Sequence, residues 1–216
     1  MSIEMVGNNT GIMAFTGATA TTNGSTGHIP MPQKGQQNHV LTGGGNWAPV
    51  NTYLQPIAAA NQHVVSFTSI PQAATEITVM FTDVSIPTRT ASDFMVRLGY
   101  GEPITWVDSG YICTTMLLID PNGSEQFRAG LGIWTNQPTR SLNCVLRISP
   151  SSPSTNMYLM SLIGTCQYGT VDTIYPIMSS GSLNMSGRLT GLYVAAATGN
   201  NAFKFGGGSI SVKYTM

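Results

Sequence analysis

The sequence predicts an all-β fold, in which an extended N-terminal arm precedes an antiparallel, jelly-roll-like β-sandwich. Strand-like segments recur from residue 63 onward, and several alternate apolar and polar residues, as at Ile77, Val79 and Phe81. Clusters of glycine, proline, asparagine and serine separate these segments, and no helical pattern exceeds two turns. Many short strands in a single domain favour two packed sheets.

We expect three segments: a docking arm (1–25), a proline- and glycine-rich linker that forms trimer contacts (26–60) and a sandwich head (61–216). The arm is small and polar, with Glu4 as its only charged residue. We interpret it as an extended arm that becomes ordered on another protein, and a disordered tail is the alternative. Its apolar anchors are Ile3, Met5, Val6, Ile12, Met13 and Phe15.

The linker combines stiff and permissive residues. Pro30 and Pro32 favour an extended, polyproline-like backbone. The glycines at 43–45 permit a tight turn or a close backbone approach. Leu41 and Trp47 flank that turn, and so short a segment has no core in which to bury them. We therefore expect them to bury against the following domain or against other copies of the chain.

The linker resembles one found in tailed-bacteriophage fibre proteins, where a G-x-V-P-x-P…G…F-L-x-G-D-G-x-W run joins a shaft to a distal domain. The residues that carry the resemblance are Gly27, Ile29, Pro30, Pro32, Gly35, Val40, Leu41, Gly43, Gly45 and Trp47. Gly44 stands where the family has aspartate. The order of strands also resembles small domains at fibre ends. The resemblance implies a homotrimer that binds other virion proteins; an ordinary interdomain linker is the alternative.

Within the head, the expected strands are 63–68, 76–81, 93–98, 110–119, 127–134, 141–148, 156–167, 171–177, 183–195 and 203–214. Met95 and Arg97 are expected to point outward. We expect one helical turn at 58–60 and a turn at 179–181. The segment 120–125 carries oxygen ligands, but Asn-Gly makes a hairpin turn a better interpretation than a calcium site.

Composition limits the partners. Only 8% of the 216 residues are charged, and nine basic residues balance nine acidic ones, which argues against a nucleic-acid partner. Near-zero net charge promotes association and fits a protein that works in an assembly. We expect no signal peptide and no membrane insertion, because no apolar run approaches the ~18 residues of a membrane helix. Three unpaired, buried cysteines would fit a reducing cytoplasm: Cys113, Cys144 and Cys166.

The sequence argues against an enzyme and implies no cofactor or metal. It has no zinc-binding cluster and no G-x-S-x-G serine elbow. The scattered acidic residues in the head do not by themselves make a glycosidase pair. Sugar binding is more plausible, since aromatic faces with nearby amides and an arginine suit carbohydrates. The candidates are Tyr100, Trp106, Trp134 and Arg140, with Tyr111 also near a loop; packing of these aromatics in the core or at a subunit interface is the alternative.

These observations and the resemblance predict a bacteriophage virion structural protein that is assembled in the host bacterial cytoplasm. It would be a short homotrimeric tail, neck or head fibre, or a capsid-decoration protein, that is docked by its arm. The head would face the host surface and possess a site for its polysaccharide. The alternative is a free carbohydrate-binding module or a fragment of a polysaccharide depolymerase.

Overall fold

The computed structural model describes residues 39–41, 47–49, 51–86, 94–117, 124–133, 139–152, 155–168, 174–196 and 204–216. The chain divides into two compact units, Met1–Val50 and Asn51–Met216. In the first unit, β1 (His39–Leu41) and β2 (Trp47–Pro49) form an antiparallel hairpin that pairs Leu41 with Trp47. The arm anchors, Pro30 and Pro32 lie outside the described residues.

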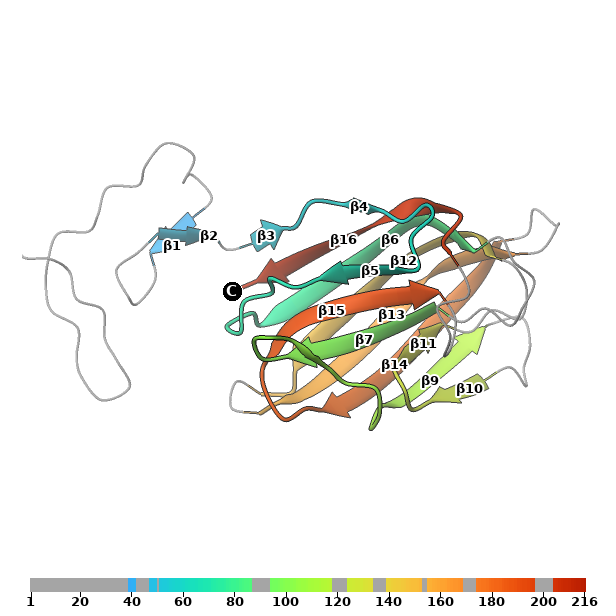
Figure 1. The fold of residues 1–216 in the computed structure, drawn as a ribbon. Helices are drawn as coiled ribbons and strands as arrows, with labels where there is room; N and C mark the ends of the chain where they lie inside the picture. The colour runs from blue at the N-terminus through green and yellow to red at the C-terminus, as the bar shows by residue number, and fades with distance from the viewer. Residues whose placement is uncertain are drawn as a thin grey trace, which may run out of the picture. The chain divides into compact units, whose positions relative to one another are not determined.

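The second unit consists of two antiparallel sheets (Figure 1). The larger has nine strands in the order β10-β9-β14-β13-β12-β6-β16-β3, with β4 also paired to β16. Its strands are β3 (Asn51–Tyr53), β4 (Ile57–Ala58), β6 (Glu76–Ile86), β9 (Ile112–Leu117), β10 (Ser124–Phe127), β12 (Thr139–Pro150), β13 (Met157–Tyr168), β14 (Ile174–Asn184) and β16 (Gly207–Thr215). The sheet thus includes residues 51–53 and 57–58, which the sequence predicts to be part of the linker.

The smaller sheet has five strands in the order β11-β7-β15-β5, with β8 paired to β7. They are β5 (Val64–Phe67), β7 (Phe94–Tyr100), β8 (Thr105–Trp106), β11 (Leu131–Ile133) and β15 (Leu189–Ala196). No helix occurs in the described ranges. The prediction of an all-β, sandwich-like fold is therefore confirmed.

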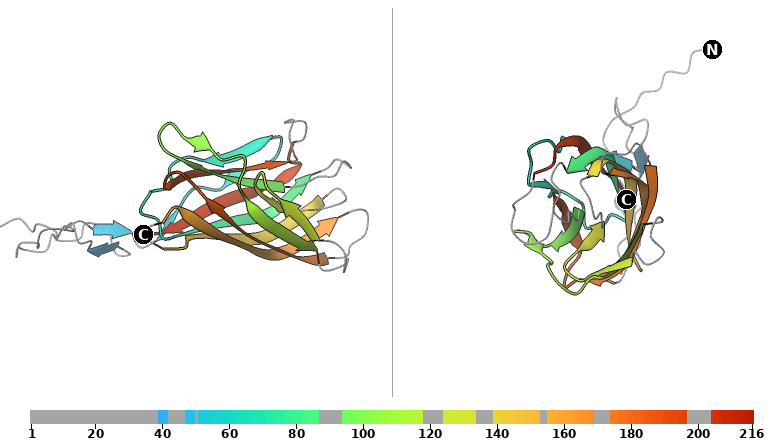
Figure 2. Two further views of the ribbon diagram at one scale, coloured as in Figure 1. Left: turned by 90° about the horizontal axis from the view of Figure 1, so that it is seen from below. Right: turned by 90° about the vertical axis from the view of Figure 1, so that its right-hand side faces the viewer.

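The core lies between the two sheets, which enclose it when the unit is viewed from its end (Figure 2). Val79, Leu146 and Leu162 come from the larger sheet and are fully or almost fully buried, as are Leu98 and Val194 from the smaller one. Burial of this apolar surface is the main favourable contribution to folding. Alternate residues of each strand supply it, because successive side chains of a strand point to opposite faces.

Two buried tyrosines tie the sheets together. The backbone N–H of Leu98 in β7 donates a 2.7 Å hydrogen bond to the hydroxyl oxygen of Tyr111, which lies just before β9. The N–H of Leu189 in β15 donates a 3.0 Å bond to the hydroxyl oxygen of Tyr158 in β13. Each hydroxyl satisfies a buried polar group that has no water to bind. These bonds help to fix how one sheet sits on the other.

Several predicted boundaries are wrong. The single strand expected at 127–134 is two strands, β10 and β11, which belong to different sheets and are separated by a bend at 128–130. The expected strand 183–195 is also split, because residue 184 ends β14 and β15 begins at 189. The helical turn expected at 58–60 is wrong, since Ala58 lies in β4 and pairs with β16.

The turn expected at 179–181 lies in the middle of β14. The serine and glycine residues at these positions are part of the strand, and Ser179 makes contacts inside the sandwich. Ser179 is buried and its hydroxyl oxygen is 3.0 Å from that of Thr115 in the neighbouring strand. Both hydroxyls reach the carbonyl oxygen of Gly132 in the opposite sheet. The polar residues that suggested a turn therefore form a bridge between the sheets.

The outward orientation expected for Met95 and Arg97 does not expose them. Met95 is only 4% exposed, because Gly130 packs directly against its side chain. The guanidinium of Arg97 donates a 2.7 Å bond to the carbonyl oxygen of Ala129 and a 2.9 Å bond to the hydroxyl of Tyr193. The bend at 128–130 covers this part of the outer face of the smaller sheet. The alternation of apolar and polar residues along a strand does not predict that another segment covers the outer face.

The prediction of three buried, unpaired cysteines is confirmed. Burial raises the pKa of the Cys113 and Cys166 thiols to about 11 in each case. Burial also raises the pKa of Cys144, with a further contribution from the nearby Cys166. A buried thiol with a raised pKa is a poor nucleophile at neutral pH, so these cysteines serve packing rather than chemistry.

Candidate functional site

The outer face of β9, β14 and β13 is the most unusual surface in the described part of the chain. Of the ten large hydrophobic side chains exposed there, seven lie on these three adjacent strands, between 40 and 73% exposed. A sheet that faces water normally presents polar residues at such positions. We call this surface the apolar face; its exposed hydrophobic residues are Ile112, Met116, Met157, Leu159, Ile163, Ile174 and Met178.

Strand register arranges the apolar face in rows. Ile163, Met178 and Met116 are consecutive partners across β13, β14 and β9. A second row, four residues away along each strand, contains Leu159 and Ile112 on either side of Ser182. Side chains of paired residues lie close enough to contact each other, so each row forms a continuous ridge.

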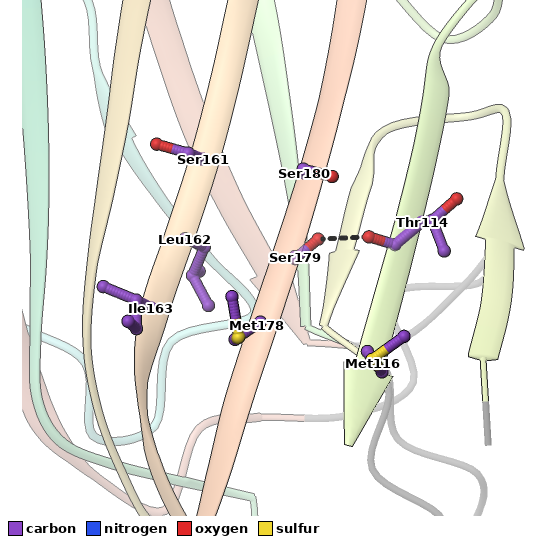
Figure 3. Close-up of a pocket in the computed structure, with 8 residues that line it drawn as sticks. All are labelled: Thr114, Met116, Ser161, Leu162, Ile163, Met178, Ser179 and Ser180. Atoms are coloured by element: carbon purple, nitrogen blue, oxygen red, sulfur yellow. Dashed lines mark hydrogen bonds between the residues drawn. The ribbon is translucent and has the colours of Figure 1, made fainter. Parts of the chain in front are cut away.

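A row of hydroxyl groups runs between the two apolar rows. It contains Ser161, Ser180 and Thr114, which are exposed and paired in register. Here the surface is hollowed, with a volume of about 410 Å³. Figure 3 draws the residues that line this hollow. Ser179 contributes to this hollow from below and donates a 3.3 Å hydrogen bond to the carbonyl oxygen of Thr114.

The three strands of the apolar face contain no charged residue at all. Charge appears only on the flanking strands, as at Arg147 in β12. The sequence does not predict this face, because apolar residues of strands are expected to lie in the core. The available signal was that both alternate sets of residues in β13 are apolar, with Tyr158, Met160 and Leu162 on one face and Leu159 and Ile163 on the other.

A second hollow, of about 720 Å³, lies at the smaller sheet and has a different chemistry. Exposed Thr68, Ser69 and Gln72 contribute hydroxyl and amide groups, and Glu102 contributes a carboxylate. The remaining lining includes the half-buried Trp106, and none of the described residues that line the hollow is lysine or arginine. Its full lining is Thr68, Ser69, Ile70, Pro71, Gln72, Gly101, Glu102, Pro103, Ile104, Trp106 and Thr190.

Two glycines set the position of Trp106. Gly99 and Gly191 are paired in β7 and β15, and the indole lies over both. A Cβ atom at Gly99 would come 2.6 Å from the indole Cε3, and one at Gly191 would come 3.3 Å from Cη2. The ring also meets Tyr193 edge-on, with centroids 4.9 Å apart. Trp106 is therefore held in one orientation at the wall of the hollow.

Three of the residues considered for sugar binding lie in the described part of the chain, and the structure does not gather them around one hollow. Tyr100 is adjacent to Trp106 along the β7–β8 pair but in the alternate position, and it packs against the core cluster and Gly187. Tyr111 is buried between the sheets. Trp134 and the side chain of Arg140 lie outside the described residues. Of the sugar-binding candidates that are described, only Trp106 lines the polar hollow.

Within the described residues, no group of three or more histidine, cysteine, aspartate or glutamate side chains could hold a metal ion. Nor does any helix in that part of the chain have the length and apolarity to cross a membrane. No family model, curated protein or solved structure matches this chain.

Proposed function

We propose that this chain is a bacteriophage virion structural protein: a short homotrimeric fibre or capsid-decoration protein with a jelly-roll-like head. The observation that carries the proposal is its division into a hairpin unit and a separate sandwich that begins at Asn51. This order matches the linker and head that the resemblance to phage fibre proteins implies. The protein would be assembled in the host bacterial cytoplasm and would work in the virion.

The β1–β2 hairpin supports the trimer. Its strands have three residues each, and a lone hairpin is at best marginally stable in water. Leu41 and Trp47 are partners in this hairpin and are half-buried. Three hairpins brought together would bury these side chains more completely, which gives a physical reason for copies to meet at the linker.

An arm, a linker and a trimer would also act together in docking. Each buried apolar anchor of the arm contributes roughly 1.5–3 kcal/mol. Ordering the arm costs about 1–2 kcal/mol for each residue, so a single arm binds only marginally. Joining three arms raises their effective concentration and can increase avidity by roughly 10²–10⁴.

The test compares the full chain with a variant that lacks residues 1–25, each added to virions that lack the protein. The full chain should join the particles, and sedimentation equilibrium should find it trimeric. The truncated chain should keep its thermal transition but fail to join. If the truncated chain joins equally well, the sandwich docks the protein and the role of the arm is wrong.

The polar hollow supports attachment to a host glycan through the head. Trp106 offers a fixed aromatic surface, and the surrounding hydroxyl and amide groups can orient a sugar. Glu102 supplies negative charge to a hollow whose described lining includes no lysine or arginine, which favours neutral or amino sugars over acidic ones. The same site would serve the alternative function, a free carbohydrate-binding module, which should be monomeric.

Glycan attachment can be tested with immobilised oligosaccharides of glucose, galactose and N-acetylglucosamine, and with sialyllactose as the acidic comparison. Wild type should bind at least one neutral or amino sugar, and Trp106→Ala should lose this binding. Tyr53→Ala is the matched control, because Tyr53 is an exposed aromatic residue outside the hollow. Binding that survives Trp106→Ala would move the attachment site elsewhere.

A further inference from the structure

We propose that the apolar face of β9, β14 and β13 is the surface through which copies of this chain bind one another. The inference rests on the proposed homotrimer for the number of copies, but the surface is defined by the sheet alone. It adds a second contact region, in the head, to the one proposed at the linker. Both would operate in the same assembly.

Apolar area is the first argument. Exposed hydrophobic residues elsewhere in the described ranges are few: Tyr53, Val64 and Met216. The apolar face gathers the other seven, and side chains of this size at 40–73% exposure present several hundred Å² of apolar surface. That equals or exceeds the largest patch on an ordinary monomer and approaches the ~800 Å² that each partner contributes to a standard interface.

Charge identifies the partner. A protein surface rich in lysine and glutamate would lose hydration on this face and find no opposite charge in its three strands. The partner must therefore offer a nearly uncharged surface. Proteins on average contain about 25% charged residues. This chain contains 8%, so another copy of it is a well-matched partner.

The row pattern is also self-complementary. Apolar rows can pack on apolar rows, and residues close to a symmetry axis meet their own equivalents. The central row of Ser161, Ser180 and Thr114 can pair with itself, because each hydroxyl both donates and accepts a hydrogen bond. A central row of lysines or carboxylates would instead repel its copy. The hydroxyl row thus adds hydrogen bonds without opposing the association.

Two substitutions of similar kind provide the test. Ile163→Lys places a charge at the β13 end of the apolar row, where the side chain is 63% exposed. Val64→Lys makes the same kind of change at a 37% exposed residue of β5, in the other sheet. Sedimentation equilibrium of the full chain should show association weakened about 100-fold or more by Ile163→Lys and unchanged by Val64→Lys.

A second variant excludes misfolding as the cause. The double change Ile163→Ser and Met178→Ser removes apolar area without adding charge, and it too should dissociate the oligomer. Near-ultraviolet circular dichroism should remain native in all variants, because both residues are exposed. If the Ile163→Lys protein remains associated like wild type, or if wild type is a monomer at micromolar concentration, the inference is overturned.

Other occupants of the face give other results. If the arm of the same chain covers the face, wild type will be monomeric, and removal of residues 1–25 will uncover the face and cause association that Ile163→Lys prevents. If a different virion protein covers it, the face variants will stay associated but fail to join particles. If the oligomer depends on the face but the protein joins no virion, the inference stands and the proposed function fails.

Discussion

Gly181 of β14 lies directly opposite Cys113 of β9, so close that a Cβ atom at Gly181 would come 2.2 Å from the cysteine sulfur. The same Cβ would also come 2.9 Å from the Cβ of Cys113 and from the carbonyl oxygen of Ile112. Glycine is required here for close approach between strands. This contact fills the space beneath the apolar face. The spacing of β14 and β9, which carry part of that face, therefore depends on the pair Gly181 and Cys113.

We predict that Gly181→Ala lowers the free energy of unfolding by about 1–3 kcal/mol, the usual cost of overpacking a core. Adding Cys113→Ala should recover part of this loss, because it removes the sulfur but leaves the Cβ contact. Urea unfolding of both single variants and the double variant, at one protein concentration, measures the coupling. Gly207→Ala is the control, since a Cβ there would meet only Ser85 Oγ at an ordinary 3.5 Å. Equal losses in the Gly181 and Gly207 variants would contradict the argument.

Tyr111→Phe should destabilise the sandwich because it removes the hydroxyl that accepts a hydrogen bond from the buried N–H of Leu98. Leaving a buried donor unsatisfied costs about 1–3 kcal/mol. Tyr53→Phe is the matched control, because Tyr53 is 64% exposed and its ring contact with Lys213 survives in phenylalanine. Chemical denaturation of the two variants should differ by at least 1 kcal/mol; identical midpoints would show that the bond between the sheets adds nothing.

The three cysteines should react slowly with a thiol reagent in the native protein at pH 8. In denaturant all three should react rapidly. The pKa of Cys113 is raised from 9.0 to about 11 by burial, so the folded state keeps its proton where the unfolded state loses it. Stability should therefore decline as pH rises from about 9 towards 11, and Cys113→Ala should reduce this decline. A titration that finds fewer than three thiols in denaturant would mean that a disulfide forms.

The sequence predicts the sandwich well because core positions recur with period two, as in Ile77, Val79 and Phe81, which are all buried. It predicts less well where a residue serves a distant partner. Ser179 resembles a turn residue until its contacts with Thr115 in β9 and with β11 are known. Such contacts join segments far apart in the chain, and local propensity carries no information about them.

The candidate sites were harder to predict for a related reason. The sequence identifies Trp106 as a candidate because a tryptophan near a loop is a recognisable signal. The glycines beneath it, Gly99 and Gly191, come from strands distant in sequence and gave no signal. The apolar face was not predicted because an exposed Ile163 and a buried Leu162 have the same character in a sequence. Only the strand register assigns them to opposite faces.

The last prediction concerns Asp83, which lies in β6 at an irregularity of the sheet and has a positive φ of 50°. Aspartate tolerates this left-handed conformation better than most residues. Its N–H donates to Asn143 Oδ1, and its carboxylate accepts bonds from the side chains of Asn143 and Ser141, each at 2.9 Å. The hydrogen bonds from Asn143 and then Ser141 hold the pKa of this carboxyl below its ordinary value of 3.8.

A lowered pKa in the folded state means that the contribution of this carboxylate is present above the unfolded pKa and lost as pH falls through the folded one. Asp83→Asn keeps a residue that tolerates the backbone conformation but loses the charged acceptor. The unfolding free energies of wild type and Asp83→Asn should therefore differ at pH 7 and converge as pH falls below 3.8. Asp83→Ala should be less stable than Asp83→Asn at every pH, because alanine also suffers the backbone strain. A gap between wild type and Asp83→Asn that stays constant from pH 7 to the acid limit would show that the carboxylate charge does not contribute to stability.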